Sequence, residues 1–98
     1  MAIIGTFTQS STGYTGSVKT LTLNAKVRFV PVEERRENGP DFRVLAGSNI
    51  ELGAAWAKTA KGGRSYHSVK LDDPGFPAPI YASLIAAEDG ALNLIWSR

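Results

Sequence analysis

The stretch IELGAAWAKTAKGGRSYHSVKL, residues 50–71, contains two runs rich in β-forming residues on either side of a Gly62-Gly63 pair. Glycine adopts positive φ angles at little cost, and a glycine pair between two such runs is typical of a tight β-hairpin turn. We therefore expect the runs at 50–59 and 64–71 to pair as antiparallel strands. This strong local signal indicates a fold built from antiparallel β-structure.

The length of the loop in this hairpin decides which side chains face the core, because side chains alternate between the two faces of a strand. A two-residue loop places Trp56 opposite Val69, and any loop of even length keeps the same sorting. The face predicted to be buried consists of Ala54, Trp56, Val69 and Leu71. The opposite, basic face consists of Lys61, Arg64, Tyr66 and Lys70. A loop of odd length would scramble this sorting.

The rest of the chain repeats the β pattern. Short runs rich in Val, Ile, Thr, Tyr and Phe are separated by Gly, Pro and Asn, which predicts strands and turns. The expected strands are 3–9, 14–23, 26–32, 41–47, 50–59, 64–71, 80–86 and 91–97. They predict a single all-β domain over residues 1–98, a small antiparallel barrel or sandwich, with an OB-like arrangement as one alternative. The segments 53–60 and 80–88 are also compatible with a helix, the second because Ile80, Leu84 and Ala87 have helical spacing.

A second hairpin is expected between the runs at 14–23 and 26–32. Asn24 tolerates the left-handed conformation that a three-residue turn over Leu23–Ala25 would need. With this turn, Leu21, Val27, Lys19 and Phe29 would share one face. Thr20, Thr22, Lys26 and Arg28 would share the other. The sheet would thus have one buried side and one polar, partly basic side.

Composition narrows the class of protein. The chain has 98 residues, 43% of them hydrophobic, which suffices for one modest core. It has no cysteine, and this excludes disulfides, zinc–thiolate sites and thiol nucleophiles. The start MAIIGTFTQ does not have the form of a signal peptide, and no apolar run reaches the roughly 20 residues of a membrane helix. We therefore expect a soluble, cytoplasmic protein that has no membrane partner.

The charges are segregated along the chain. Residues 1–32 carry cations and no acid, namely Lys19, Lys26 and Arg28. Residues 52–70 also carry cations and no acid, namely Lys58, Lys61, Arg64 and Lys70. The blocks 33–51 and 71–98 carry a net negative charge. Two purely basic blocks make nucleic acid a partner worth testing.

The segment SVKLDDPGFPAPIYASL, residues 68–84, places two aspartates before a loop with three prolines. Adjacent strand residues point to opposite faces, so Asp72 and Asp73 are poorly placed to bind one metal ion together. We expect them to accept loop N–H bonds and to end the strand. The prolines stiffen the loop, which either presents Phe76 and Tyr81 to a partner or covers an open barrel end. We favour the cover.

No constellation in the sequence predicts catalysis. His67 is the only histidine and is expected to pack at the edge of the core or lie at the surface. Trp56 and Trp96 are expected in the core, because tryptophan buries a large apolar area. Motifs for phosphate cradles, nucleophile elbows and zinc sites are missing from the sequence. The sequence therefore predicts no catalytic residue, no metal and no cofactor.

The chain resembles one known family along nearly its whole length. The resemblance lies in MAIIGTF, GYTGSVKTLTLN, PDFRV, ELGAAW, YHSVKLDDPGFPAPIYASL and LIWSR. These segments are similar to the domain-of-unknown-function 736 family of small bacterial proteins. The resemblance implies a protein from a mobile genetic element, such as a conjugative plasmid, and it implies no activity. One departure, an extra residue in AGSNIELGAAW, predicts a bulge or longer turn at Ser48-Asn49.

These observations lead to two functional hypotheses. The first is a non-enzymatic accessory protein that binds single- or double-stranded DNA, with Tyr66 stacking on a base. Its phosphate contacts would be Lys58, Lys61, Arg64 and Lys70, extended by Lys19, Lys26 and Arg28. The alternative is a protein-binding module that inhibits or modulates a host defence complex, with Phe76 and Tyr81 in the contact loop. Either protein could form a symmetric homo-oligomer through a strand edge.

Overall fold

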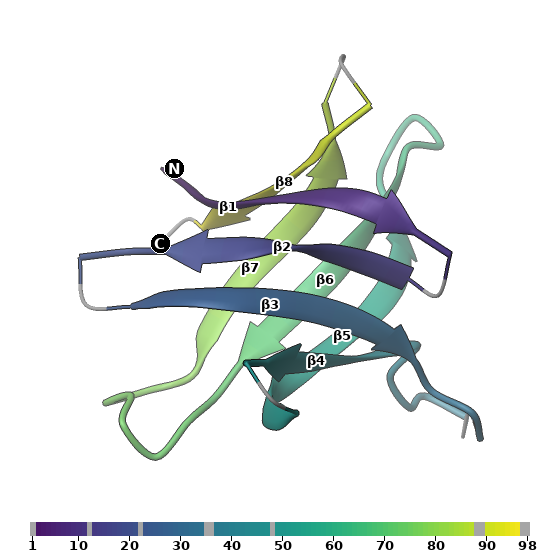
Figure 1. Cartoon of the computed structure of the whole chain (residues 1–98). Helices are drawn as coiled ribbons and strands as arrows, with labels where there is room; N and C mark the ends of the chain where they lie inside the picture. The colour runs from purple at the N-terminus through teal and green to yellow at the C-terminus, as the bar shows by residue number, and fades with distance from the viewer. Residues whose placement is uncertain are drawn as a thin grey trace.

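The computed structural model describes residues 2–11, 13–21, 23–34, 37–47, 49–87 and 90–96, and it contains eight strands (Figure 1). The strands are β1 (Ala2–Ser10), β2 (Gly13–Lys19), β3 (Asn24–Pro31), β4 (Phe42–Ala46), β5 (Ile50–Thr59), β6 (Ser65–Leu71), β7 (Ile80–Ala86) and β8 (Leu92–Trp96). Each of them lies within one or a few residues of a strand expected from the sequence. The described parts of 53–60 and 80–88 form strand or loop, which overrules their helical alternative.

The eight strands form a closed antiparallel barrel in which neighbours in sequence are neighbours in space. The ring closes where β1 pairs with β8, from Ala2 opposite Trp96 to Phe7 opposite Leu92. Closure leaves no unpaired strand edge. The predicted small antiparallel barrel is thereby confirmed. Its up-and-down order differs from the OB-like alternative, since an OB fold is a five-stranded Greek-key barrel.

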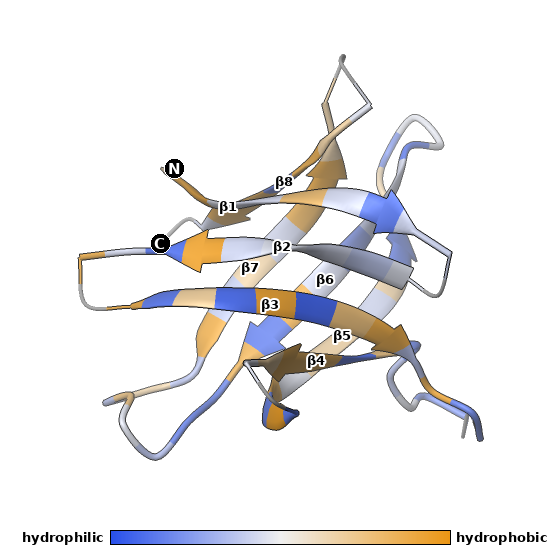
Figure 2. Ribbon diagram, viewed as in Figure 1, coloured by the Kyte–Doolittle hydropathy of each residue, from blue (hydrophilic) through white to orange (hydrophobic). Residues whose placement is uncertain are grey.

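The core fills the inside of the ring with mainly apolar side chains, which alternate along each strand with outward-facing residues. Figure 2 shows this alternation plainly in β3, where hydrophilic and hydrophobic residues follow one another. Phe7 and Phe29 lie at the centre with an edge-to-face contact, their ring centroids 5.1 Å apart. The remaining core side chains are Ile4, Val18, Val27, Val44, Leu52, Ala55, Val69, Leu71, Ala82, Leu84 and Leu94.

The loop between β5 and β6 has five residues, Ala60–Arg64, and not two. Ala60 N–H donates to Arg64 O at 2.8 Å, and Gly63 N–H donates to Ala60 O at 3.1 Å. Because this loop length is odd, Trp56 lies opposite Ser68 and Ala55 lies opposite Val69. The predicted register is therefore wrong by one residue. Trp56 points outward and Ala55 takes its place in the core.

The loop between β2 and β3 also differs from the prediction. Lys19 lies opposite Asn24, and Leu23 N–H donates to Thr20 Oγ1 at 3.0 Å. The turn therefore starts earlier than expected, and Lys19 faces outward with Lys26. Leu21, expected on the buried face, is fully exposed at 102%. Thr22, also assigned to a face, lies outside the described residues.

The proline-rich segment between β6 and β7 lies at one end of the barrel (Figure 1). Asp73 Oδ2 accepts a hydrogen bond from Gly75 N–H at 2.8 Å, and Phe76 N–H donates to Asp73 O at 2.8 Å. These bonds turn the chain so that Phe76 packs against the core beside Trp96. The structure thus confirms the turn-forming role of Asp73.

An irregularity in β5 lies close to the predicted one. The register between β4 and β5 shifts after Val44, where Leu52 is the extra residue and turns into the core. Asn49 has a positive φ of 73° in the turn before β5. Ser48, the other residue named in the prediction, is outside the described residues. The bulge therefore lies a few positions beyond the turn.

His67 lies inside the barrel near the opposite end, between two aromatic rings. Its ring centroid is 5.5 Å from that of Tyr14 and 5.2 Å from that of Phe42. Partial burial lowers the pKa of His67 below its ordinary value of 6.5, and the negative charge of Asp41 opposes this shift. The predicted packing role of His67 is thereby confirmed.

Replacement of Gly16 by alanine should destabilise the barrel strongly. A Cβ atom there would lie 2.0 Å from Thr6 O and 2.8 Å from Phe7 Cα, so β1 and β2 would have to separate. We expect Gly16→Ala to lower the free energy of unfolding by about 2–4 kcal/mol, measured by urea denaturation. Ser17→Ala, whose side chain faces outward, is the control. A similar small effect of both substitutions would contradict this close approach of the strands.

The lowered pKa of His67 predicts a loss of stability in mild acid. Because the pKa is lower in the folded state, the unfolded state takes up the proton first, and stability falls as pH drops below about 6.5. The wild type should therefore lose more unfolding free energy between about pH 7.5 and about pH 5.5 than His67→Asn, which does not titrate there. Urea denaturation at both pH values measures the difference. Equal losses in both proteins would contradict the burial of a neutral imidazole.

Candidate nucleic-acid interface

Aromatic and basic side chains gather on the outer side of β5, β6 and the start of β7. We name this the basic–aromatic face; it consists of Trp56, Lys58, Tyr66, Ser68, Lys70 and Tyr81. Lys58 lies opposite Tyr66 on the neighbouring strand. Lys70 lies opposite Tyr81. Each cation therefore has an aromatic ring as its direct cross-strand neighbour.

Trp56 occupies the middle of this face. Its direct neighbour across the sheet is Ser68, a small residue. Its diagonal neighbours on β6 are Tyr66 and Lys70, within reach of a long or aromatic side chain. Trp56 itself is half-buried, so part of the indole is accessible to solvent. The face thus offers a large ring surface flanked by positive charge.

The charge distribution of the strands favours an anionic partner. All six strand-borne cations point outward: Lys19, Lys26, Arg28, Arg43, Lys58 and Lys70. The strands carry a single carboxylate, Glu51, whose Oε1 lies 3.4 Å from Arg43 Nε. The other acids that the structure describes lie in the connections between strands. The outer surface of the sheet is therefore positive, because its one strand carboxylate is paired with Arg43 and the other described acids lie in the loops.

The connection between β5 and β6 extends this face. Lys61 and Arg64 are exposed on the 60–64 loop, which continues directly from Lys58 and Tyr66. In Figure 1 this loop projects beyond the barrel at the ends of β5 and β6. The structure therefore brings together five of the predicted contact residues, from Lys58 to Lys70.

The other predicted cations lie elsewhere. Lys19 is on β2, and Lys26 and Arg28 are on β3. In a closed ring of eight strands β2 and β6 are four strands apart in either direction, and Figure 1 shows β1–β3 in front of β5–β7. These three cations therefore face away from the basic–aromatic face and do not extend it.

The two residues predicted for a partner-binding loop are also separated. Phe76 is half-buried and packs against the core at the 72–79 loop. Tyr81 is 61% exposed and points outward from β7. Because it lies opposite Lys70, Tyr81 belongs to the basic–aromatic face.

Trp56 is the one residue of this face that the sequence analysis assigned to the core. Its neighbours Ala54, Ala55 and Ala57 are all small enough for either face of the sheet. The apolar pattern of β5 is therefore nearly the same in both registers. Only the length of the loop at 60–64 distinguishes them, and no residue type in AKGGR fixes it.

Within the ranges that the structure describes, no three His, Cys, Asp or Glu side chains are grouped so that they could hold a metal ion. The same ranges contain no helix that is long and apolar enough to cross a membrane.

Comparison with known proteins gives a family and no closer relative. Among curated proteins none matches this chain, and among solved structures none matches it either. One family model, described as a protein of unknown function, DUF736, matches residues 3–98. The match covers nearly the whole chain and agrees with the resemblance seen in its sequence motifs. The chain therefore belongs to the DUF736 family.

Proposed function

We propose that the protein binds single-stranded nucleic acid on the basic–aromatic face, as a non-enzymatic accessory protein of a mobile genetic element. The observation that carries the proposal is the outward position of Trp56 between Tyr66 and Lys70. Proteins that bind single strands combine cationic grooves with aromatic platforms on which bases stack. The association with a mobile element, such as a plasmid, rests on the resemblance to the family. The expected cytoplasmic location rests on the composition and on the form of the first residues.

The chemistry of the face suits bases and phosphates at once. Trp56, Tyr66 and Tyr81 provide ring surfaces, each supporting a base by about 1–3 kcal/mol. Lys58 and Lys70 stand beside these rings, where the phosphates of a stacked strand would pass. No carboxylate of the described residues pairs with either lysine. Both ammonium groups are thus available for a polyanion.

Binding to labelled oligothymidine, followed by fluorescence anisotropy across a salt series, tests the proposal. Neutralisation of phosphates by Lys58, Lys61, Arg64 and Lys70 releases counterions, so log K should fall with log salt by about 0.7 per phosphate contacted. We expect micromolar affinity at low salt and a steep loss at high salt. The absence of binding at low salt would overturn the proposed function.

Substitution of Trp56 separates stacking from charge. Trp56→Ala should weaken oligothymidine binding by about tenfold, because one base loses its platform, and leave the salt slope unchanged. Trp56→Phe keeps a ring and should retain most of the affinity. Leu21→Ala, at an exposed apolar residue away from this face, is the control. An unchanged affinity in Trp56→Ala would show that strands bind elsewhere.

A second candidate function, contact with a host protein complex, is favoured by one feature. The exposed large apolar side chains Ile3, Leu21, Ile50 and Tyr81 all lie at the barrel end that carries the 72–79 loop. The same end has an apolar hollow of about 320 Å³, lined by Thr20, Leu23, Gly75, Phe76, Pro77, Ala78, Pro79, Ile80 and Trp96. Exposed apolar groups concentrated at one place often mark a protein contact.

The double variant Leu21→Ser, Ile50→Ser tests this second candidate. If the barrel end contacts a host protein or a second copy of the chain, the variant should lose that association, seen by affinity purification and by light scattering. Lys58→Ala, which alters the basic–aromatic face, should keep it. The reverse pattern would favour the nucleic-acid proposal instead.

A further inference from the structure

The side of the barrel opposite the basic–aromatic face has its own chemistry. The outward side chains of β1, β2 and β3 form what we name the hydroxyl–basic face, which consists of Thr6, Thr8, Thr15, Ser17, Lys19, Lys26 and Arg28. All of them are exposed except Ser17, which is half-buried. No aromatic ring and no carboxylate occurs among the residues of β1–β3 that point outward.

The strand register arranges this face in two rows. Thr6 lies opposite Ser17, and Ser17 lies opposite Lys26. The second row runs parallel to the first and consists of Thr8, Thr15 and Arg28. Each row therefore carries two hydroxyl groups and ends in a cation. Strand geometry sets the residues within a row about 4.8 Å apart and the rows about 6.8 Å apart.

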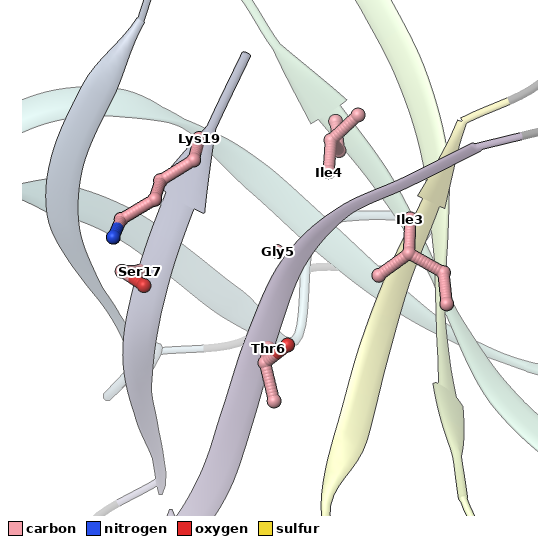
Figure 3. A pocket seen from close by; sticks show the side chains of 6 residues that line it. All are labelled: Ile3, Ile4, Gly5, Thr6, Ser17 and Lys19. Atoms are coloured by element: carbon pink, nitrogen blue, oxygen red, sulfur yellow. The ribbon is translucent and has the colours of Figure 1, made fainter.

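A hollow opens beside the first row, between β1 and β2. It has a volume of about 140 Å³ and is lined by Ile3, Ile4, Gly5, Thr6, Ser17 and Lys19. Figure 3 shows Ser17 and Lys19 on β2, and Gly5 and Thr6 next to each other on the neighbouring strand β1. Because a water molecule takes up about 30 Å³, the hollow has room for a phosphate group.

The electrostatics of this face are uniformly positive. The nearest carboxylate borne by a strand is Glu51, which lies beyond Leu45 in the row that starts at Arg28. Glu51 is already paired with Arg43. Lys19, Lys26 and Arg28 therefore have no competing anion on their own face.

We propose that the hydroxyl–basic face binds the sugar–phosphate backbone of double-stranded nucleic acid. Hydroxyl and cationic side chains are the usual contacts to phosphate oxygens, and they need no access to the bases. In a duplex the bases are stacked inside the helix and cannot stack on protein side chains. A face without aromatic rings therefore forgoes no stacking contact when it binds a duplex. A single strand, by contrast, gains most from the rings on the opposite side of the barrel.

The two faces point in opposite directions, so one molecule can hold a duplex and a single strand at the same time. The bridging part of this inference rests on the proposed function, while duplex binding by β1–β3 does not. A protein with this arrangement would act where both forms of nucleic acid meet, for example beside a partly unwound duplex.

Two triple variants with the same change of net charge test the assignment. The first is Lys19→Ala, Lys26→Ala, Arg28→Ala, and the second is Lys58→Ala, Lys61→Ala, Arg64→Ala. Anisotropy with a short blunt duplex should show about tenfold weaker binding for the first variant and little change for the second. With oligothymidine the order should reverse. Thermal unfolding of each variant verifies that these outward substitutions leave the barrel folded.

A charge-neutral variant sharpens the test. Thr6→Ala, Ser17→Ala removes two hydroxyl donors and should weaken duplex binding by about threefold, with an unchanged salt slope and unchanged binding of oligothymidine. Bridging is then measured by energy transfer between a donor-labelled oligothymidine and an acceptor-labelled duplex of unrelated sequence. Wild type should give transfer, and each triple variant should give clearly less transfer at the same protein concentration.

The outcomes separate the two proposals. Equal loss of duplex binding in both triple variants would overturn the inference, because net charge alone would explain it. Duplex binding lost only in the second variant would overturn it as well. If wild type binds the duplex through β1–β3 and fails to bind oligothymidine, the proposed function falls and the hydroxyl–basic face stands.

Discussion

The pairing of β1 with β8 is the constraint on which the rest of the structure depends. It closes a meander of hairpins into a barrel. The interior of a closed barrel has to be packed with side chains, and its outer surface is exposed to solvent. Once the barrel is closed, the position of a strand in the ring fixes the direction in which its outward side chains point. The opposition of β2 and β6, and with it the separation of the two basic surfaces, is a consequence of closure among eight strands.

The sequence predicts the strands well and the faces less well. All eight β-runs are visible because turn residues interrupt them, and Val27 and Phe29 are buried as expected. The pattern fails where a strand is rich in residues that fit both sides of a sheet. Ala54, Ala55 and Ala57 around Trp56 have no preference for the inner or the outer face of the sheet. Whether the 60–64 loop has an odd or an even number of residues therefore decides whether Trp56 points outward. Parity depends on the hydrogen bond from Gly63 to Ala60, which no local residue pattern encodes.

Most described cations lie on strands, whereas most described acids lie in the connections between strands. Cations stand on the strands, where the sheet holds them at fixed spacings. Glu33, Glu34, Glu37, Asp72 and Asp73 stand in the connections at the two ends. The positive charge of the strands therefore lies on β2–β6, while β1, β7 and β8 carry no cation. Such an arrangement directs a polyanion to these strands and to the neighbouring 60–64 loop, which carries Lys61 and Arg64.

Closure of the barrel also requires one strand pairing that is slow to form during folding. Seven of the eight strand pairings join neighbours along the chain and have low contact order, whereas the β1–β8 seam joins residues near the two ends. The seam therefore forms late, after the entropy of the whole intervening chain has been lost. Until it forms, β1 and β8 are open edges, and two chains that meet in this state can exchange terminal strands. Such an exchange would give a domain-swapped dimer.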